Sequence, residues 1–529
     1  MKWMGAVLSA CLLSACGAGS SSGGAPTPAP TPSPTPQSTP TPSPTPAAGP
    51  VPTHFVVFVL DDLSVDDANF MQVKGGKYTP QLDALAAQST VLTNYQIVTP
   101  VCTASRYSLL TGNYPSRATN GVFQRRLVRE GAAIPEFNVA ITAADMTLPR
   151  RLQALGYRTG FTGKDHVSDT TYPAIAAGAK SSDPGMADVL ENARQLGIAG
   201  VHNMGFDEVY AVYPANVYEW PVTDLRVHNL DWIVDGALKF IDANADKKFF
   251  LEVSLTVPHY PFDAAHSWNA DPRATPFGFL PQAPNVMPAR STLTSRVKTA
   301  GYPGNENFLW MDDAIGAVLD SLKSHGLSDS TAILVEGDNG VTVDPVSGET
   351  LKGEIYIPGT WTPAFWYYRG IKGRTDELTS NLDFQPTILE ITGQQPVGDG
   401  VSLLPLLEGN PGPVRPNLYL EIGYARSVIE GDYQYIAVRH TPYIKNLAAT
   451  KGFPLTHWVG YGGPHALELI TMKEFAHFFD PDQLYNFRSD PGEQNNLYGQ
   501  INYQATSDHL RGVMRAQASK MPGTFEVGP

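Results

Sequence analysis

Four short apolar runs, each followed at once by polar residues, constrain the fold of this chain more than any other feature. They are FVVFVL at 55–60, RTGFT at 158–162, FFLEVSLTV at 249–257 and AILV at 332–335. Nearly unbroken apolar runs of this length are typical of parallel strands that are buried on both faces of a sheet. Helix-like segments separate the runs and would cover the sheet. They lie at 80–88, 147–155 and 307–325. We therefore predict an α/β domain with a large, mostly parallel mixed sheet flanked by helices.

The residues that follow these runs can bind ions or move protons. In chain order they are Asp61, Asp62, Lys164, His166, His259, Asp338 and Asn339. Ligands of open α/β sheets bind along the carboxyl edge, so we expect these side chains to converge there. Two pairs, Asp61-Asp62 and Asp338-Asn339, offer only oxygen atoms as metal ligands. This favours a hard cation such as calcium or magnesium over zinc. The alternative is that each pair merely ends a strand or forms a turn.

Cys102 stands apart from the other two cysteines, which lie at positions 11 and 16. It precedes the segment 104–110, which is typical of the start of a helix, where negative charge is favoured. Arg106 falls on the same helix face, four residues on. A single cysteine in an exported protein is either a buried apolar residue or a reactive one. The nearby arginine favours the reactive interpretation.

The N-terminal segment predicts export. Residues 1–16, MKWMGAVLSACLLSAC, combine an early lysine, a short apolar stretch and small residues, as a signal peptide does. The end of this segment resembles a bacterial lipobox, which implies a lipid on Cys16; an ordinary signal peptide cut elsewhere is the alternative. Residues 17–52 are rich in proline, serine and threonine and carry no charge, so they form a linker rather than a core. We expect an exported lipoprotein, anchored in a membrane and located at the outer membrane, the cell surface or the periplasm.

The remaining chain divides into two predicted parts. We place a catalytic domain at 53–405 and a smaller C-terminal α+β subdomain at 406–529, where the short aromatic strands LYLEIGY and YQYIAVRH precede a helix-like tail at 503–519. The chain has 37 basic and 51 acidic residues, a formal charge of -14 and no basic run. This charge excludes nucleic acid as an expected partner.

Several motifs resemble those of the formylglycine-dependent sulfatases, a family of the alkaline phosphatase superfamily. They are CTASR with LLTGNYPSR at 102–117, GYRTGFTGKDH at 156–166, PHYP at 258–261, GDNG at 337–340 and LYNFRSDPGEQNNL at 484–497. The resemblance runs in order from about residue 53 to about residue 500 and implies a sulfuric ester hydrolase with the alkaline-phosphatase-like fold. It implies that a formylglycine-generating or anaerobic sulfatase-maturating enzyme oxidises Cys102 to formylglycine. Its substrate would be a sulfated small molecule or saccharide.

The resemblance also implies roles for individual residues. Calcium, rather than magnesium, would be bound by Asp61, Asp62, Asp338, Asn339 and the hydrated aldehyde at position 102. One hydroxyl of that hydrate would attack sulfur, and loss of a proton from the other would release sulfate. Arg106 would anchor the hydrate and His166 would act on it, while His259 would protonate the leaving group. Lys164 and Lys352 would hold the sulfate oxygens.

The segment after Lys352 departs from the family pattern, because 356–363 keeps the tyrosine, glycine and final proline but loses the charged residues. Asp165 replaces an aromatic residue of the family and adds a negative charge beside the site.

Two other functions remain open from the sequence. A phosphonate monoester or phosphodiester hydrolase of the same superfamily would use the same nucleophile and metal. An inactive carbohydrate-binding surface lipoprotein would need only the linker and aromatic residues able to stack on sugar rings. Aromatic residues gather at 210–232, at 361–368 and around Trp458. Such residues stack on ligands in some proteins and pack in the core in more of them.

Overall fold

The computed structural model describes residues 49–528, except 74, 344–349, 411, 461 and 466–470. The predicted signal peptide at 1–16, the lipidation site Cys16 and the linker as far as residue 48 lie outside the described residues. The last residues of the predicted linker contact the folded body: the Gly49 N–H donates a hydrogen bond to the Arg369 carbonyl (3.0 Å). Among the helices of the described part, none has the length and apolar character that a membrane crossing requires.

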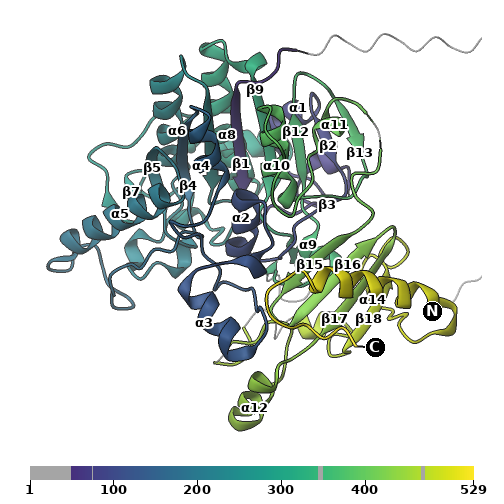
Figure 1. Ribbon diagram of the computed structural model, residues 1–529. Coiled ribbons are helices and arrows are strands. Elements are labelled where there is room, and N and C mark those ends of the chain that lie inside the picture. The colour runs from purple at the N-terminus through teal and green to yellow at the C-terminus, as the bar shows by residue number, and fades with distance from the viewer. Residues whose placement is uncertain are drawn as a thin grey trace, which may run out of the picture. The chain divides into compact units, whose positions relative to one another are not determined.

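An eight-stranded sheet forms the centre of the folded part (Figure 1), with the strand order β13-β2-β12-β9-β1-β6-β4-β5. Its strands are β1 (His54–Leu60), β2 (Thr90–Leu92), β4 (Arg158–Lys164), β5 (Glu208–Tyr213), β6 (Phe249–Leu255), β9 (Thr331–Gly337), β12 (Ala364–Tyr367) and β13 (Gly373–Thr375). Strands β9, β1, β6, β4 and β5 run parallel, and β12 is antiparallel to both of its neighbours. The predicted mixed, mostly parallel sheet is confirmed.

The side chains of β1 alternate between two hydrophobic cores, which explains its unbroken apolar run. Phe55, Val57 and Val59 enter one core, and the intervening residues enter the other. All seven residues of β1 are buried. The first core is shared with α2 (Cys102–Thr111), α4 (Leu148–Ala154) and α10 (Phe384–Ile391), and the second with α1 (Pro80–Ala86), α6 (Leu230–Asn244) and α8 (Glu306–Ser324). The three predicted helices correspond to α1, α4 and α8.

The register of the central strands brings their carboxyl ends level. Leu60, the last residue of β1, pairs with Leu255 of β6 on one side and with Gly337 of β9 on the other. In β4, Gly163 pairs with Ser254 of β6, so the next residue lies at the same edge. The residues that follow β1, β6 and β9 therefore leave the sheet side by side, as a ligand-binding edge requires.

A second, four-stranded antiparallel sheet forms the core of the C-terminal part. Its order is β15-β16-β17-β18, with strands Leu418–Ile422, Ala425–Glu430, Tyr433–Val438 and Asp482–Asn486. Helix α14 (Gln504–Ala518), near the end of the chain, packs on β16 and β17, as Figure 1 shows in yellow. The predicted smaller α+β subdomain is therefore present.

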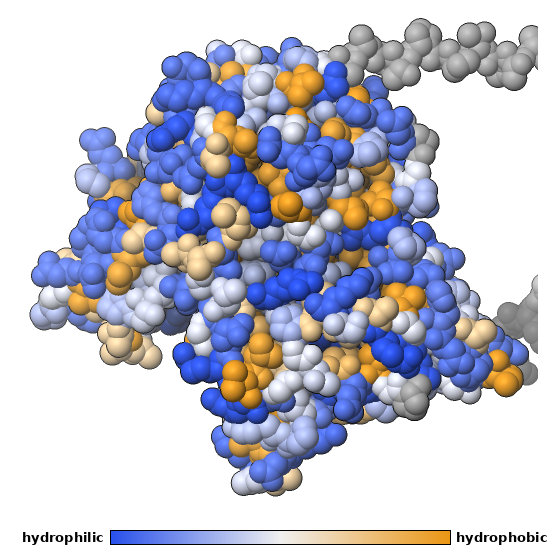
Figure 2. All heavy atoms as spheres, in the orientation of Figure 1, coloured by the Kyte–Doolittle hydropathy of each residue, from blue (hydrophilic) through white to orange (hydrophobic). Residues whose placement is uncertain are grey.

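The other elements are short or lie at the periphery. They are α3 (Gly121–Glu130), α5 (Met186–Asn203), α7 (Leu293–Thr299), α9 (Ile357–Thr360), α11 (Leu404–Leu407), α12 (Pro442–Lys451), β3 (Tyr95–Gln96), β7 (Ala274–Thr275), β8 (Gly278–Phe279), β10 (Thr342–Val343), β11 (Thr350–Leu351) and β14 (Thr379–Ser380). The face seen in Figure 2 is mostly hydrophilic, with smaller hydrophobic patches between. This surface is expected, because the two cores bury most of the large apolar side chains.

Candidate active site

Polar side chains from five segments meet at the carboxyl edge of the sheet. Asp61 and Asp62 follow β1, Lys164 ends β4, His259 follows β6, and Asp338 with Asn339 follows β9. Cys102 is the first residue of α2, as the sequence predicted. All of these side chains are buried. Because buried charges are stable only when they are paired or bind ions, this collection indicates a functional site.

The acidic residues form a compact cluster of possible ligand atoms. The Asp62 N–H donates a hydrogen bond to Asp338 Oδ1 (3.1 Å), and Asn339 Nδ2 donates one to Asp62 Oδ1 (2.7 Å). One ligand atom from each of Asp61, Cys102 and Asp338 lies within 4.8 Å of the others. Asn339 Oδ1 is buried and has no hydrogen-bond partner within the described part of the chain. A buried oxygen without a partner, next to three carboxylates, fits a hard cation such as calcium.

Three cationic side chains surround this cluster. Lys164 Nζ lies 2.6 Å from Asp61 Oδ2, and Lys352 Nζ lies 3.0 Å from Asp62 Oδ1. Arg106 binds Asp338 Oδ2 through its NH2 group (2.9 Å) and the Lys164 carbonyl through NH1 (3.1 Å). Three carboxylates thus face three basic side chains in a buried volume. Both lysines predicted to hold sulfate oxygens lie in the site.

The charges around Cys102 do not make it a reactive thiolate. Burial raises the pKa of the Cys102 thiol to about 11, against the opposing effect of Lys164 and Lys352. At neutral pH the group is therefore a protonated thiol, which is a weak nucleophile. Burial also raises the pKa of Asp338 to about 6, and repulsion from Asp61 adds to the shift. Asp62 behaves differently: burial favours its neutral form, yet His259 and the lysines hold its pKa below the usual range.

The two predicted histidines are both buried but have different surroundings. Burial lowers the pKa of His259 to about 4, although Asp62 opposes the shift. Its Nε2 lies 3.1 Å from Lys352 Nζ, and its Nδ1 is 2.8 Å from the Tyr260 carbonyl. Burial also lowers the pKa of His166 well below its ordinary value. Its Nδ1 is buried and has no hydrogen-bond partner among the residues described. Both rings are therefore neutral and able to accept a proton.

Lys164 is positioned by the sheet itself. Gly163 has a φ of +115°, and a Cβ added there would lie 1.8 Å from the Ser254 carbonyl oxygen on β6. Only glycine allows the two backbones to approach this closely. Ser254 Oγ donates a hydrogen bond to the Lys164 carbonyl (2.8 Å) and also contacts Arg106, while Asn216 accepts one from Lys164 Nζ (2.5 Å). Neither Ser254 nor Asn216 was predicted as a site residue from the sequence. Ser254 could have been noticed as a polar residue within an apolar run, whereas Asn216 carries no such signal.

Lys352 is positioned by the C-terminal subdomain. It lies between β11 and α9, in a segment from 352 to 357 that we call the lysine loop. The backbone and side chains of the lysine loop contact four residues of the C-terminal part. Gln434 Nε2 donates to the Ile355 carbonyl (2.7 Å), Tyr356 OH donates to Gln483 Oε1 (2.9 Å), the Ile357 N–H donates to Glu493 Oε2 (2.7 Å), and the Tyr356 ring stacks on Phe475 with centroids 3.7 Å apart. One sign of this arrangement is visible in the sequence, because Glu493 lies within the tail motif at 484–497.

The comparisons with known proteins agree with this geometry. The sulfatase family model matches residues 53–394. The chain belongs to the sulfatase family. It is 27% identical to arylsulfatase A of Homo sapiens over 491 residues, which cover 89% of this chain and 88% of the relative. It is 24% identical to an ulvan-active sulfatase of Formosa agariphila over 464 residues, covering 85% and 78%. A solved structure described as a complex with its substrate D-glucosamine-2-N,6-O-disulfate has a TM-score of 0.58 at 16% identity, covering 90% of this chain and 100% of that one.

This sulfatase brings every predicted catalytic and metal-binding residue into or beside one site, and the predicted lipidation site Cys16 lies outside the described residues. Asp165, the departure from the family pattern, does not leave a free charge at the site. Its carboxylate accepts hydrogen bonds from the Val167 N–H (3.2 Å), the Ser168 N–H (2.9 Å) and the Ser168 hydroxyl. It therefore stabilises the turn that carries His166, whose φ is +54°.

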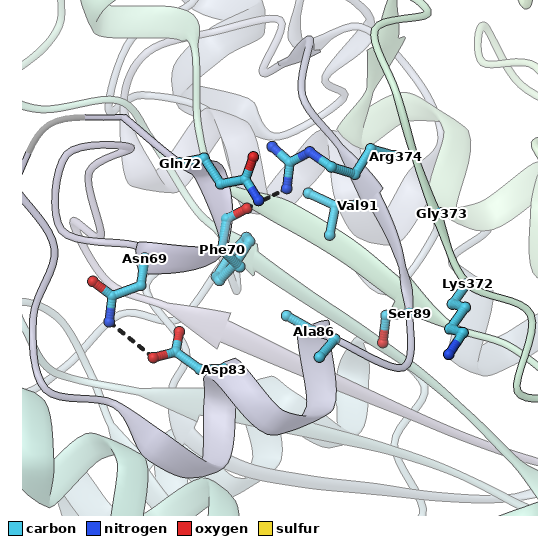
Figure 3. A pocket seen from close by; sticks show the side chains of 11 residues that line it. Asn69, Phe70, Gln72, Asp83, Ala86, Ser89, Val91, Lys372, Gly373 and Arg374 are labelled. Carbon is cyan, nitrogen blue, oxygen red and sulfur yellow. Dashed lines mark hydrogen bonds between the residues drawn. The ribbon is translucent and has the colours of Figure 1, made fainter.

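The sulfatase also has a cavity of about 580 Å³ away from this cluster (Figure 3). It is lined by residues near α1, β2 and β13, and none of the predicted site residues lines it. Arg374 donates a hydrogen bond to the Met71 carbonyl (3.1 Å), and the Asn69 amide donates one to Asp83 (2.8 Å). Both polar side chains therefore already have hydrogen-bond partners within the protein. The cavity gives no reason to place the active site there.

Proposed function

We propose that this sulfatase hydrolyses a sulfate monoester, with a saccharide sulfate as the favoured substrate, through a formylglycine made from Cys102 and with calcium as its metal. One observation carries the proposal: Lys352 Nζ lies 3.3 Å from Cys102 Sγ and 3.0 Å from Asp62 Oδ1. A cation able to hold a sulfate oxygen is therefore beside both the nucleophile position and the acidic cluster. Asp61, Asp62, Asp338 and Asn339 would hold the metal.

The thiol of Cys102 does not suit the reaction in its unmodified form, because its raised pKa keeps it protonated. Oxidation by a maturating enzyme would replace it with an aldehyde. The hydrated aldehyde would supply an oxygen nucleophile, and the cation would supply positive charge near it. The position at the start of α2 supports this assignment, since the helix N-terminus favours developing negative charge.

The side chains of the chain itself would bind the ester and move protons. Lys164 and Lys352 would hold sulfate oxygens, and Arg106 would fix the nucleophile against Asp338. His259 would give a proton to the leaving group, because a bound anion beside its ring favours the protonated form. His166 would accept a proton at the nucleophile, since its ring is neutral and one ring nitrogen has no other partner within the described residues.

The charge balance of the site supports an anionic substrate. Asp61, Asp62 and Asp338 carry three negative charges when ionised, and Arg106 with the two lysines carries three positive charges. A divalent cation would leave the buried site with two uncompensated positive charges. A sulfate monoester, with one negative charge, would offset one of them, and the released sulfate dianion would offset both.

Mass spectrometry of the peptide containing residue 102, from protein made in its native host, tests the nucleophile. We expect a loss of about 18 Da relative to cysteine, which is the change from thiol to aldehyde. Cys102→Ala, purified in parallel, controls for folding and should release no sulfate. An unmodified thiol in protein that is fully active would refute the formylglycine assignment.

Matched substrates and metal exchange test the reaction class. We expect faster release of sulfate from a sulfate monoester than of the corresponding product from a phosphonate monoester or a phosphodiester with the same leaving group. Chelation should abolish activity, and calcium should restore it better than magnesium, because the cluster is an all-oxygen site with carboxylate and amide ligands. Preference for the phosphodiester would favour the other hydrolase of the superfamily.

We also propose that the enzyme is exported and anchored to a membrane through a lipid on Cys16. The sequence of residues 1–16 supports this anchor. Separately, the similarity to an ulvan-active sulfatase and to a structure with a sulfated glucosamine supports the saccharide substrate proposed above. Radiolabelled fatty acid should be incorporated into the wild-type protein and not into Cys16→Ser. Equal labelling of both proteins would exclude this anchor.

A further inference from the structure

A row of three aromatic side chains leads away from His259. The Tyr218 ring stacks on the His259 ring, with centroids 5.8 Å apart and an angle of 15° between the planes. Tyr218 contacts Tyr260 edge to face (5.7 Å), and Tyr260 contacts Phe262 in the same way (5.9 Å). We call Tyr218, Tyr260 and Phe262 the aromatic row. It begins at the ring that would face the leaving group.

The aromatic row is exposed, unlike the other aromatic groups near the site. Tyr218, Tyr260 and Phe262 are 39%, 53% and 47% exposed. They are three of the seven large aromatic side chains that are exposed among the described residues, and they lie in contact with one another. Trp458, on the side of His166, is buried against the backbone of Gly353. Single exposed aromatic residues are ordinary, whereas a contiguous row beside an active site indicates a binding surface.

Hydrogen bonds hold the two segments that carry the row, one to the site and one to α8. Asn216, two residues before Tyr218, accepts a hydrogen bond from Lys164 Nζ (2.5 Å). At the other end, Asn307 of α8 donates one to the Phe262 carbonyl (3.0 Å). The Tyr260 carbonyl binds His259 Nδ1 (2.8 Å). The aromatic faces are thus held at a set position relative to the sulfate-binding lysines and to His259.

We infer that the aromatic row binds the leaving group of the substrate, which is an alcohol with a flat apolar face, either a pyranose ring or an aryl ring. This inference rests on the proposed function, because that function places the ester oxygen next to His259. A ring attached to that oxygen, directly or through one carbon, extends beyond His259 and meets Tyr218 and then Tyr260. Aromatic side chains bind such faces by stacking, and an acyclic alcohol offers no comparable face.

Three sulfate esters distinguish a pyranose, an aryl and an acyclic leaving group. Methyl glucoside 6-sulfate and glycerol 1-sulfate are both esters of primary alcohols, so they differ mainly in the ring, and 4-nitrophenyl sulfate supplies the aryl case. We expect Tyr218→Ala and Tyr260→Ala to lower kcat/KM for at least one ring ester about three- to tenfold more than for glycerol 1-sulfate. A loss confined to one ring ester identifies the ring class. Tyr218→Phe and Tyr260→Phe keep the ring and should keep the preference.

Two controls keep the result interpretable. Phe279→Ala removes an aromatic side chain of similar exposure (48%) elsewhere and should leave the ratio of the rates unchanged. Tyr260→Ala keeps the backbone carbonyl that binds His259, so its effect does not come from a displaced histidine. Equal losses on the ring and acyclic esters in both alanine variants would overturn the inference.

A binding measurement distinguishes failure of this inference from failure of the proposed function. Cys102→Ala has no nucleophile precursor, and calorimetry can compare its affinity for the three esters with and without Tyr260→Ala. Tighter binding of a ring ester that is lost with Tyr260→Ala supports the aromatic row even if the wild-type protein hydrolyses none of the esters. Equal affinities for ring and acyclic esters, unchanged by Tyr260→Ala, overturn it even if sulfate is released.

Discussion

The two lysines of the active site perform the same task from opposite kinds of structure. Lys164 is the last residue of a central strand, and its neighbours in β6 fix its backbone. Lys352 lies on a loop outside the eight-stranded sheet, and residues of the C-terminal subdomain hold that loop in place. Even so, the two ammonium groups bind adjacent carboxylates, Asp61 and Asp62.

The difference shows what each part of the molecule contributes to the site. The strand side follows from regular strand pairing, because the register of β4 with β6 is enough to place Lys164, although Ser254 lies 90 positions along the chain. The loop side depends instead on individual contacts with another subdomain, such as Gln434 with Ile355 and Glu493 with Ile357. The C-terminal subdomain therefore belongs to the active site in a physical sense, although none of its contacts named here reaches the reacting groups.

Replacement of either lysine should have the largest effect on activity. We expect Lys164→Met and Lys352→Met each to lower kcat/KM by about 10²- to 10³-fold, the usual cost of losing one group that stabilises negative charge in a transition state. Steady-state release of sulfate measures this, with circular dichroism as a check on folding. If either variant kept activity within fivefold of the wild type, that lysine would not hold the sulfate group.

The glycines next to the two lysines test how rigid each side is. Gly163→Ala would place a Cβ 1.8 Å from a backbone oxygen of β6, and Gly353→Ala would place one 2.5 Å from the Trp458 side chain. Both positions have positive φ. A strand backbone cannot move aside as a side chain can, so we expect Gly163→Ala to destabilise the protein by about 4 kcal/mol or more and Gly353→Ala by about 1–3 kcal/mol.

Urea unfolding at equilibrium measures these changes in the free energy of unfolding. Gly393→Ala serves as a control for positive φ alone, because its φ is +76° and no atom lies within 4 Å of the added Cβ. The comparison of the two sides would be wrong if Gly353→Ala were the more destabilising of the pair.

The same contrast explains how much the sequence could predict. The runs that became β1, β4, β6 and β9 were recognisable because central strands are apolar throughout, and the polar residues after them had to share an edge. Lys164 and His166 followed from one short motif. Lys352 was identified only through a weakened pattern, since its position depends on Gln434, Gln483 and Glu493, and no local periodicity reports a contact across such distances in sequence. Tyr218 was visible as an aromatic residue, but its exposure depends on how the loops fold.

Glu493 tests whether the C-terminal subdomain acts through Lys352. Its Oε2 accepts the Ile357 N–H, and both groups are buried, so Glu493→Ala leaves a buried donor without a partner. We expect kcat/KM to fall about 10- to 100-fold as the lysine loop shifts. Glu493→Gln keeps an acceptor oxygen and should restore most of the activity, and Glu526→Ala, at an exposed site in the same subdomain, should have no effect.

A double variant separates positioning from general damage to the fold. If Glu493 acts through Lys352, then Glu493→Ala should add little to the loss of kcat/KM already caused by Lys352→Met. It should add its full effect to Lys164→Met. Full additivity with both lysine variants would mean that Glu493 supports the fold alone.

Single polar side chains on the two sides should give the smallest effects on activity and the finest comparison. Ser254→Ala removes the hydroxyl bond to the Lys164 carbonyl, and Gln434→Leu removes the amide bond to the Ile355 carbonyl. Each change should cost about 1–3 kcal/mol of stability, because two buried hydrogen bonds are lost: Ser254 Oγ also accepts one from Arg106, and Gln434 Nε2 also donates one to Ser427 Oγ (2.8 Å). Activity should respond differently: pairing within the central sheet keeps the backbone of Lys164 in place without Ser254, whereas Lys352 lies outside that sheet, after the short strand β11. We therefore expect a larger fall in kcat/KM for Gln434→Leu than for Ser254→Ala at equal loss of stability, measured on the same preparations. The opposite order would show that the contact of Ser254 with Arg106 matters more to catalysis than the position of the loop.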